Sequence, residues 1–351
     1  MNPRVGILLV NLGTPDSAEP RAVKRYLTQF LTDGRVIDIP FFLRQLLVRG
    51  VIIPKRYRNS AKLYQAIWKP EGSPLKIYSY ELKDKLQEAL GNSFQVELAM
   101  RYQTPSIETG LENLRSCQKI VLIPLFPQYA SATTGSVYQE VFRILQTWEV
   151  IPSLVCMDGF ATHEEVIHAF CQAARQYDLA QYDHFLFSYH GLPERQVQKA
   201  DRCHHCLKTP NCCQELTDKN RTCYAAQCVA TTAAICRQLK LPQEAVSHCY
   251  QSRLGKDPWI QPYASNVLEK LAKEGKKKIL VFSPAFVADC LETLQEIGIE
   301  YQAEFKQWGG EKLDLVEGLN ARPEWVSALK SIILTQLPSK ERNECTRSPN
   351  I

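Results

Sequence analysis

Short, continuous apolar runs alternate along this chain with segments of helical periodicity. The runs are Val5–Val10, Ile120–Ile123, Phe185–Phe187 and Ile279–Phe282. A strand buried on both faces of a parallel sheet has this pattern, because no position along it faces water. Between the runs, residues 162–165 fit a capping box, and apolar positions follow at helical spacing. The alternation predicts α/β architecture with parallel sheets.

The two halves of the chain resemble each other weakly. Gln103–Pro105 precedes a helical pattern and then the strand pattern that starts at Lys119. Gln261–Pro262 precedes the same succession and a strand pattern that starts at Lys278. Any two helix–strand units can look alike, but this repeated pattern and the length of 351 residues favour two α/β domains.

Composition narrows the class of protein. Hydrophobic residues make up 45% and charged residues 23%, which is typical of a soluble globular protein. The net charge of +5 is too small to indicate a nucleic-acid partner. No run approaches the roughly 20 apolar residues of a membrane span, and no secretory leader precedes the first strand pattern. These features predict a cytoplasmic protein.

The domain boundaries follow from breaks in the pattern. Gly159 lies between an apolar run and a helical segment, so we expect a boundary near it. The predicted amino-terminal domain consists of residues 1–158 and about 310–338, and the second domain spans 159–309. Residues 339–351 are polar and predict a flexible tail.

Two polar clusters follow strand patterns of the second domain. His190 ends the run that begins at His184, and Gly191 and Pro193 break it. The carboxyl end of a parallel strand is where open α/β sheets bind ligands, and imidazole can accept a proton or bind a metal there. Asp289, Glu292 and Glu296 follow the last run at helical spacing and share one predicted helical face. The alternative without a function is that His190 is only packed at a strand end and that the three carboxylates form a solvent-exposed helical face.

Further candidates are weaker when taken alone. Trp259 follows a turn and could line a pocket for a flat ligand or pack in the core. Arg101 and Tyr102 add a cation and a ring. Residues 41–58 are very apolar with a basic edge. They predict either a lip that contacts a bilayer or an apolar ligand, or a core helix with a solvated end, and the pattern slightly favours the core helix.

Thirteen cysteines are many for a protein inside the cell, and five of them fall between Cys203 and Cys223. A C-x-x-C pair followed by further cysteines indicates a metal site rather than disulfides. Zinc, with His204 or His205 as additional ligands, and a [2Fe–2S] cluster both suit this segment.

Taken together, the segments resemble the ferrochelatase family, whose members insert ferrous iron into a porphyrin. The resemblance covers roughly residues 4–335 and is carried, in order, by residues 6–15, 71–75, 101–102, 127–129, 133–136, 188–193, 251–253, 258–259 and 292–294. It implies two Rossmann-like domains with parallel sheets and an active-site cleft between them, the type I chelatase arrangement. The opening through residues 38–40 is similar to the proteobacterial branch, which favours protoporphyrin IX over coproporphyrin.

The resemblance also implies roles for individual residues. His190 matches the family's histidine, as proton acceptor or Fe²⁺ ligand, and Glu292 matches its glutamate, as Fe²⁺ ligand. Asp289 and Glu296 are then expected to relay protons or metal. The expected porphyrin-binding residues are Ser73, Arg101, Tyr102, Trp259 and Leu43, the last in a lip at residues 41–53.

The insert at residues 200–223 departs from the shorter bacterial members of the family. Some relatives carry a [2Fe–2S] cluster in this region, so the resemblance implies a cluster on Cys203, Cys206, Cys213 and Cys223, with Cys212 as a substitute and Zn²⁺ as the alternative. Protoporphyrin IX and Fe²⁺ are the expected substrates, with peripheral contact at the inner membrane. The competing functions are a cobalt or nickel chelatase of a related tetrapyrrole and a non-catalytic haem or iron carrier. A nicotinamide-dependent enzyme is disfavoured because no G-x-G-x-x-G follows the first strand.

Overall fold

The computed structural model describes residues 5–209, 211–255 and 257–337. The predicted tail at 339–351 lies outside the described residues. The chain forms two compact units. Of the described residues, unit 1 contains 5–125, 131–159 and 320–337, and unit 2 contains 126–130 and those between 160 and 319.

Unit 1 is built on a four-stranded parallel sheet in the order β2-β1-β3-β4. Its strands are β1 (Val5–Gly13), β2 (Phe94–Tyr102), β3 (Lys119–Pro124) and β4 (Ser153–Cys156). Its helices are α1 (Pro20–Leu31), α2 (Phe41–Leu47), the π-helix η1 (Val48–Ile52), α3 (Ile53–Ile67), α4 (Pro74–Leu90), α5 (Ile107–Asn113), the π-helix η2 (Ser131–Gly135), α6 (Ser136–Leu145) and α12 (Pro323–Thr335). The central strand β1 is buried along almost its whole length, as its apolar run predicts.

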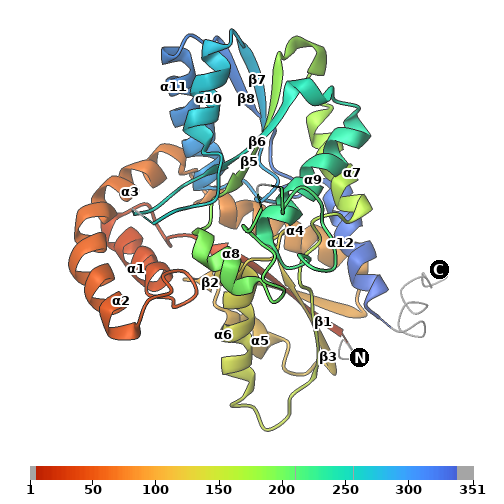
Figure 1. Cartoon of the computed structure of the whole chain (residues 1–351). Helices are drawn as coiled ribbons and strands as arrows, with labels where there is room; N and C mark the ends of the chain where they lie inside the picture. Colours follow the sequence, from red (N-terminus) through yellow and green to blue (C-terminus); the bar gives the residue numbers. More distant parts are fainter. Residues whose placement is uncertain (1–4, 210, 256, 338–351) are drawn as a thin grey trace, which may run out of the picture. The chain divides into compact units, whose positions relative to one another are not determined.

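Unit 2 has the same sheet topology, in the order β6-β5-β7-β8. Its strands are β5 (His184–His190), β6 (Val246–Gln251), β7 (Lys278–Phe282) and β8 (Lys312–Leu315). Its helices are α7 (Glu164–Ala174), α8 (Glu194–Ala200), α9 (Tyr224–Leu239), α10 (Ala264–Lys273), the π-helix η5 (Glu292–Tyr301), α11 (Gln302–Gln307) and the short 3₁₀ turns η3 (Leu179–Gln181) and η4 (Gln243–Ala245). Figure 1 shows α10 and α11 on one face of this sheet and α7 and α9 on the other. The prediction of α/β architecture with two parallel sheets is confirmed.

The two units repeat each other in detail. At the end of β2, the backbone N–H of Met100 donates to the carbonyl of Pro105, 2.7 Å away. At the end of β6, the N–H of Tyr250 donates to the carbonyl of Pro262, 2.8 Å away. The helix that follows each proline is α5 or α10, as the repeated pattern in the sequence predicts. The return from Met100 takes five residues and the return from Tyr250 takes twelve, so unit 2 carries an additional excursion there.

Two sequence-based boundaries need correction. The chain returns to unit 1 at Asn320 rather than near residue 310. The reason is that β8 pairs with β7 and therefore belongs to the second sheet. The capping box at 162–165 is also wrong, because α7 begins at Glu164 and its N-cap is His163, which makes no side-chain capping bond.

Among the described residues, none of the helices has both the length and the apolar character needed to cross a bilayer.

Candidate active site

His190 is the last residue of β5, at the carboxyl edge of the unit 2 sheet. Its side chain is half-buried, and its Nδ1 lies 2.7 Å from the carbonyl oxygen of Gly191. A carbonyl only accepts hydrogen bonds, so Nδ1 carries the proton and the lone pair is on Nε2. The ring is thus held in the tautomer that can accept a proton or bind a metal at Nε2.

Trp259 packs beside His190, in the excursion that distinguishes unit 2 from unit 1. The ring centroids of His190 and Trp259 lie 6.5 Å apart. The ring centroid of Phe286 also lies 6.5 Å from that of His190. The indole N–H donates to the carbonyl of Leu254, 3.0 Å away. A Cβ on Gly191 would come within 3.1 Å of the Trp259 ring, so glycine allows this close packing. Trp259 is almost fully buried, so it is a wall that also belongs to the core of unit 2.

Glu292 and Glu296 lie in the π-helix η5, which follows β7. Both are half-buried, and η5 is anchored through the buried side chains of Ile297 and Tyr301. The Glu296 carboxylate accepts hydrogen bonds from Gln251 Nε2 at 2.9 Å, from the Ser252 hydroxyl and from the Tyr301 hydroxyl at 3.0 Å. A π-helical segment is a frequent feature of functional sites. The plainer interpretation of a solvated acidic face does not hold for these two residues.

Asp289 lies before the helix, not on it. Its buried carboxylate accepts from the Thr293 hydroxyl at 3.0 Å and from the backbone N–H of Gly318 at 3.2 Å. The prediction that three carboxylates share one helical face is therefore wrong for Asp289. Its contacts fix the start of η5 to the segment after β8.

Gln251 belongs to segment 251–253 of the family resemblance, which assigned it no role, and it connects the two parts of the site. It pairs with His190 across the β5–β6 ladder, and its side chain donates to the Glu292 carbonyl as well as to Glu296. The signal that could have found it is the internal repeat, because Gln251 occupies the position that Arg101 has in unit 1.

Arg101 and Tyr102 belong to a buried hydrogen-bond network in unit 1 around Asp33. The Asp33 carboxylate accepts from Arg101 at 2.8 Å, from the Tyr102 hydroxyl at 2.9 Å and from the Ser136 hydroxyl at 2.6 Å. Burial alone would raise the pKa of Asp33, but Ser136, the Arg35 backbone N–H and the Arg101 charge lower it below its ordinary value. Tyr102 is 0% exposed, so the prediction that it walls the porphyrin is not supported, and it holds Asp33 instead.

The lip and Ser73 have different surroundings. Ser73 is buried and its hydroxyl lies 2.9 Å from that of Thr14.

None of the residues of α2 is buried, and Phe42 and Leu43 are 84% and 59% exposed. The interpretation of residues 41–58 as a core helix, which the sequence pattern slightly favoured, is therefore wrong for α2, whose apolar side chains are exposed, but it holds for Val48 and Ile53, which are buried.

The cysteine-rich segment gathers four thiols. The Sγ atom of Cys213 lies 3.3 Å from that of Cys212 and 3.7 Å from that of Cys223, and Cys206 also contacts Cys223. Cys203, which the resemblance placed among the ligands, is exposed. In the parts of the chain that the structure describes, no three potential ligands form a ready metal site. The gathered thiols are nevertheless the donor set that both zinc and iron–sulfur clusters use.

Hydrogen bonds to sulfur shape this segment further. The backbone N–H of Leu207 donates to Cys212 Sγ at 3.0 Å. The contact with Cys213 lowers the pKa of Cys223 to about 6 against the opposing effect of burial, helped by backbone N–H groups at the start of α9. Cys223 therefore loses its proton before Cys206 and Cys213, because burial raises the pKa of Cys206 and the contact with Cys223 raises the pKa of Cys213.

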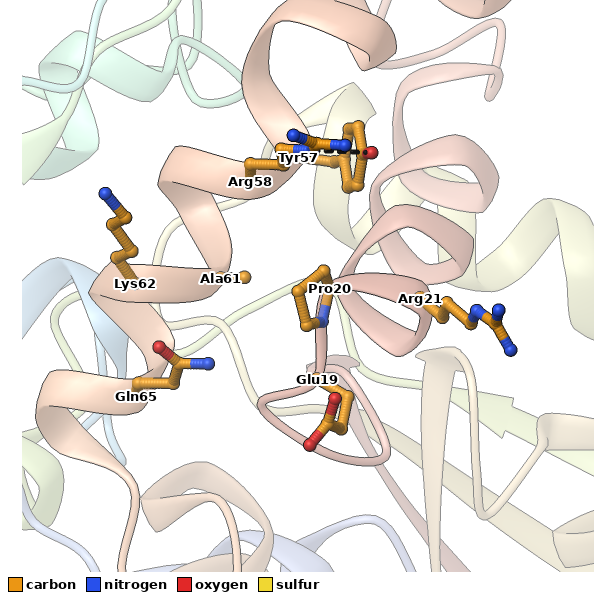
Figure 2. A pocket seen from close by; sticks show the side chains of 8 residues that line it. All are labelled: Glu19, Pro20, Arg21, Tyr57, Arg58, Ala61, Lys62 and Gln65. Atoms are coloured by element: carbon orange, nitrogen blue, oxygen red, sulfur yellow. Dashed lines mark hydrogen bonds between the residues drawn. The ribbon is translucent and has the colours of Figure 1, made fainter.

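A cavity of about 640 Å³ lies between α1 and α3 in unit 1. Figure 2 shows Lys62 and Arg21 pointing to opposite sides and Arg58 bonded to the hydroxyl of Tyr57. Its lining residues are Glu19, Pro20, Arg21, Tyr57, Arg58, Ala61, Lys62 and Gln65. The lining contains no histidine, no cysteine and no pair of carboxylates, so it does not resemble a metal-handling site.

The family model for ferrochelatase matches residues 4–337 of this chain. The chain belongs to the ferrochelatase family. A ferrochelatase of Legionella pneumophila (strain Corby) is 45% identical over 334 residues, covering 95% of this chain and 100% of that protein. A ferrochelatase of Coxiella burnetii (strain Dugway 5J108-111) is 44% identical over 331 residues, covering 93% and 92%.

Solved structures agree on the fold. The structure of SirB from Bacillus subtilis with Fe³⁺ aligns over 96% of this chain and 97% of that chain, with a TM-score of 0.52 and 12% sequence identity. At that identity the likeness concerns the fold alone. The ferrochelatase family assignment makes this chain a metal chelatase that inserts ferrous iron into protoporphyrin in haem biosynthesis.

Proposed function

We propose that unit 2 performs the proton and metal transfers of iron insertion, with His190 and Glu292 as the catalytic residues. The observation that carries this proposal is the hydrogen bond from His190 Nδ1 to the Gly191 carbonyl, which leaves a lone pair on Nε2. Iron insertion releases two N–H protons of the porphyrin while one Fe²⁺ enters. A base held at the sheet edge in this tautomer can accept such a proton.

The carboxylates supply the second requirement. Glu292 offers an oxygen ligand to Fe²⁺, and Glu296 adds negative charge within the same helix. Imidazole and carboxylate bind Fe²⁺ without the strong retention that thiolates would give, so the metal can pass on to the porphyrin. Trp259 remains a proposed porphyrin contact because its ring lies beside His190, and Leu43 remains one because its side chain is exposed. Ser73 and Arg101 are instead held by Thr14 and by Asp33 and Ser136.

Anaerobic incubation with protoporphyrin IX and Fe²⁺, followed by absorbance, tests the proposal. We expect the rate of metal insertion to be higher with Fe²⁺, which gives haem, than with Co²⁺ or Ni²⁺. Preference for cobalt or nickel, or binding of porphyrin without turnover, would point to the competing chelatase or to a carrier. Parallel assays with coproporphyrin decide between the two porphyrin substrates.

We further propose that the cysteine-rich segment holds a [2Fe–2S] cluster on Cys206, Cys212, Cys213 and Cys223. The thiol contacts and the Leu207 N–H bond to Cys212 support this set, and the exposure of Cys203 argues against its inclusion. When bound, such a cluster would cross-link the segment and stabilise it. The Tyr224 hydroxyl, one residue after Cys223, donates to the His190 carbonyl at 2.9 Å, so the segment also adjoins the strand that carries the base.

Single Cys→Ser variants should separate ligands from the neighbouring thiol. We expect Cys212→Ser and Cys223→Ser to lose the visible absorbance of the cluster and its bound iron and sulfide, and to unfold at a lower temperature. Cys203→Ser is the matched control and should keep all three. Retention of the cluster by Cys212→Ser, with loss in Cys203→Ser, would refute this ligand set, and zinc without iron in metal analysis would refute the cluster.

The lip provides a candidate contact with membranes, and we propose that a cytoplasmic protein docks there peripherally on a bilayer. The exposed apolar residues of α2 adjoin exposed basic residues at Lys55 and Arg56, a combination typical of interfacial helices. Arg44 does not take part, because its guanidinium donates to the carbonyls of Thr32 and Ile39.

Co-sedimentation with vesicles checks this contact. The wild-type protein is expected to bind vesicles that contain anionic lipid, and Phe42→Glu should reduce the bound fraction several-fold because it places a charge in the apolar surface. Val150→Glu replaces an equally exposed apolar residue of unit 1 outside the lip and serves as the control. Equal binding by the two variants would refute docking through α2.

A further inference from the structure

The repeat between the units places Arg101 and Gln251 at the same position. Met100 and Tyr250 make equivalent hydrogen bonds to Pro105 and Pro262, so the residues that follow them, Arg101 and Gln251, correspond. The strand register agrees, because Gly13 lies beside Tyr102 at the end of β1 as Gly191 follows His190 at the end of β5.

Both side chains reach the helix that follows the next strand along the chain, which is β3 for Arg101 and β7 for Gln251. Arg101 Nε donates to the carbonyl of Ser136 at 3.1 Å and to its hydroxyl at 2.7 Å. Gln251 Nε2 donates to the carbonyl of Glu292 at 3.2 Å and to the carboxylate of Glu296 at 2.9 Å. Each residue thus fastens a helix to the strand end through one backbone carbonyl and one side chain.

The two units differ in the charge of this residue, because Arg101 is a cation and Gln251 is neutral. In unit 1 the guanidinium of Arg101 forms an ion pair with the buried Asp33. In unit 2 the Glu296 carboxylate receives hydrogen bonds from the neutral groups of Gln251, Ser252 and Tyr301. Within the described ranges, no lysine or arginine forms an ion pair with Glu296. Its negative charge is held in place but not cancelled.

The amide of Gln251 has one orientation. Its Nε2 faces a carbonyl and a carboxylate, which only accept, and its Oε1 accepts from the Ser188 hydroxyl at 2.6 Å. The residue is 2% exposed, so turning the amide over would bury acceptors against acceptors. Ser188 lies on β5, two residues before His190, so the strand that carries the base also orients the amide.

We propose that Gln251 is a positioning residue that holds Glu296 and the first turn of η5 at the strand end of His190 while adding no charge. The inference rests on the proposed function of this site. A cation at position 251, as unit 1 has at Arg101, would neutralise Glu296 and weaken its attraction for Fe²⁺. A side chain without hydrogen-bonding groups would leave the charge but release the helix.

Two substitutions separate the effect of the Gln251 hydrogen bonds from the effect of charge at position 251. Gln251→Met keeps the length of the side chain and removes its hydrogen bonds. It should lower kcat/KM for Fe²⁺ by about tenfold or more, the usual effect of losing a hydrogen bond to a charged group. Gln251→Arg restores donors and adds a cation, so it should raise KM for Fe²⁺ beyond the Met variant. KM for protoporphyrin should change less than twofold in both.

The control uses a glutamine elsewhere in the same unit. Gln238→Met and Gln238→Arg, on α9 where the amide contacts His168, should match the wild-type kinetics. Melting temperatures report whether each variant folds. Should a Gln251 variant fail to fold, Ser188→Ala tests the same contact more gently, and a several-fold rise in KM for Fe²⁺ is expected from release of the amide.

The outcomes distinguish this inference from the site assignment. Wild-type Fe²⁺ kinetics in Gln251→Met or in Ser188→Ala would show that Gln251 does not position Glu296 and η5. Wild-type KM for Fe²⁺ in Gln251→Arg would show that the absence of charge at position 251 does not matter. A general loss of protoporphyrin affinity in a folded variant would indicate a merely structural role and overturn both parts of the inference. If His190→Ala and Glu292→Gln stay active, the site assignment itself fails, whatever Gln251 does.

Discussion

Replacing His190 with alanine is expected to lower kcat for iron insertion by about 10²- to 10⁴-fold, the range that a positioned general base contributes. The reason is the fixed tautomer, because the imidazole offers its Nε2 lone pair at the carboxyl edge of the sheet. The loss should fall on kcat rather than on protoporphyrin affinity, since the ring of Trp259 remains in place. Anaerobic turnover and fluorescence titration with protoporphyrin measure the two quantities separately.

His168→Ala is the matched control for this experiment. His168 lies on α7, where it contacts Gln172 and Gln238 rather than residues of the proposed site. The control should retain wild-type turnover. A His190→Ala protein that turns over at the wild-type rate would show that the proton acceptor lies elsewhere, and one that binds protoporphyrin weakly would reassign His190 to substrate binding.

Replacing Glu292 with glutamine should have the second large effect, a loss of about 10²-fold in kcat/KM for Fe²⁺. The substitution removes the charge and one oxygen ligand while the backbone carbonyl can still accept from Gln251. Oxygen and imidazole ligands suit transient binding of Fe²⁺, and an amide is a weaker ligand than a carboxylate. Steady-state rates at varied Fe²⁺ under anaerobic conditions measure the change.

Glu269→Gln provides a comparison on the same unit. Glu269 pairs with Lys273 on α10, and its loss should leave Fe²⁺ kinetics unaltered. If the two glutamine variants behave alike, Glu292 is not a ligand of the incoming metal. If Glu292→Gln changes only protoporphyrin affinity, the carboxylate acts on the porphyrin instead.

The architecture could be predicted from the sequence because its signals are local. A strand buried on both faces is apolar at every position, so β1, β3, β5 and β7 stand out without knowledge of their neighbours. The repeated pattern around Pro105 and Pro262 predicted the repeat for the same reason. The return to unit 1 was placed too early because β8 is a short edge strand, recognisable only through its pairing with β7.

The contacts within the site depend on segments that are distant in the chain, and these were harder to predict. His190 and Glu292 could be recognised by resemblance, yet Gln251 joins strand and helix through partners about 40 and 60 residues away, as the separations to Glu292 and Ser188 show. The family resemblance implies that Tyr102 lies at a wall of the porphyrin site. Its hydroxyl instead finds Asp33, and nothing near it in sequence announces that partner.

The hydrogen bond from Tyr224 to the His190 carbonyl has a consequence for how the protein ages under oxidising stress. Tyr224 directly follows Cys223, and its hydroxyl is bonded to the carbonyl of His190 at the end of β5, so a chemical change at that sulfur occurs next to a contact of this strand. Oxidation of this one thiol would therefore act on the end of β5 as well.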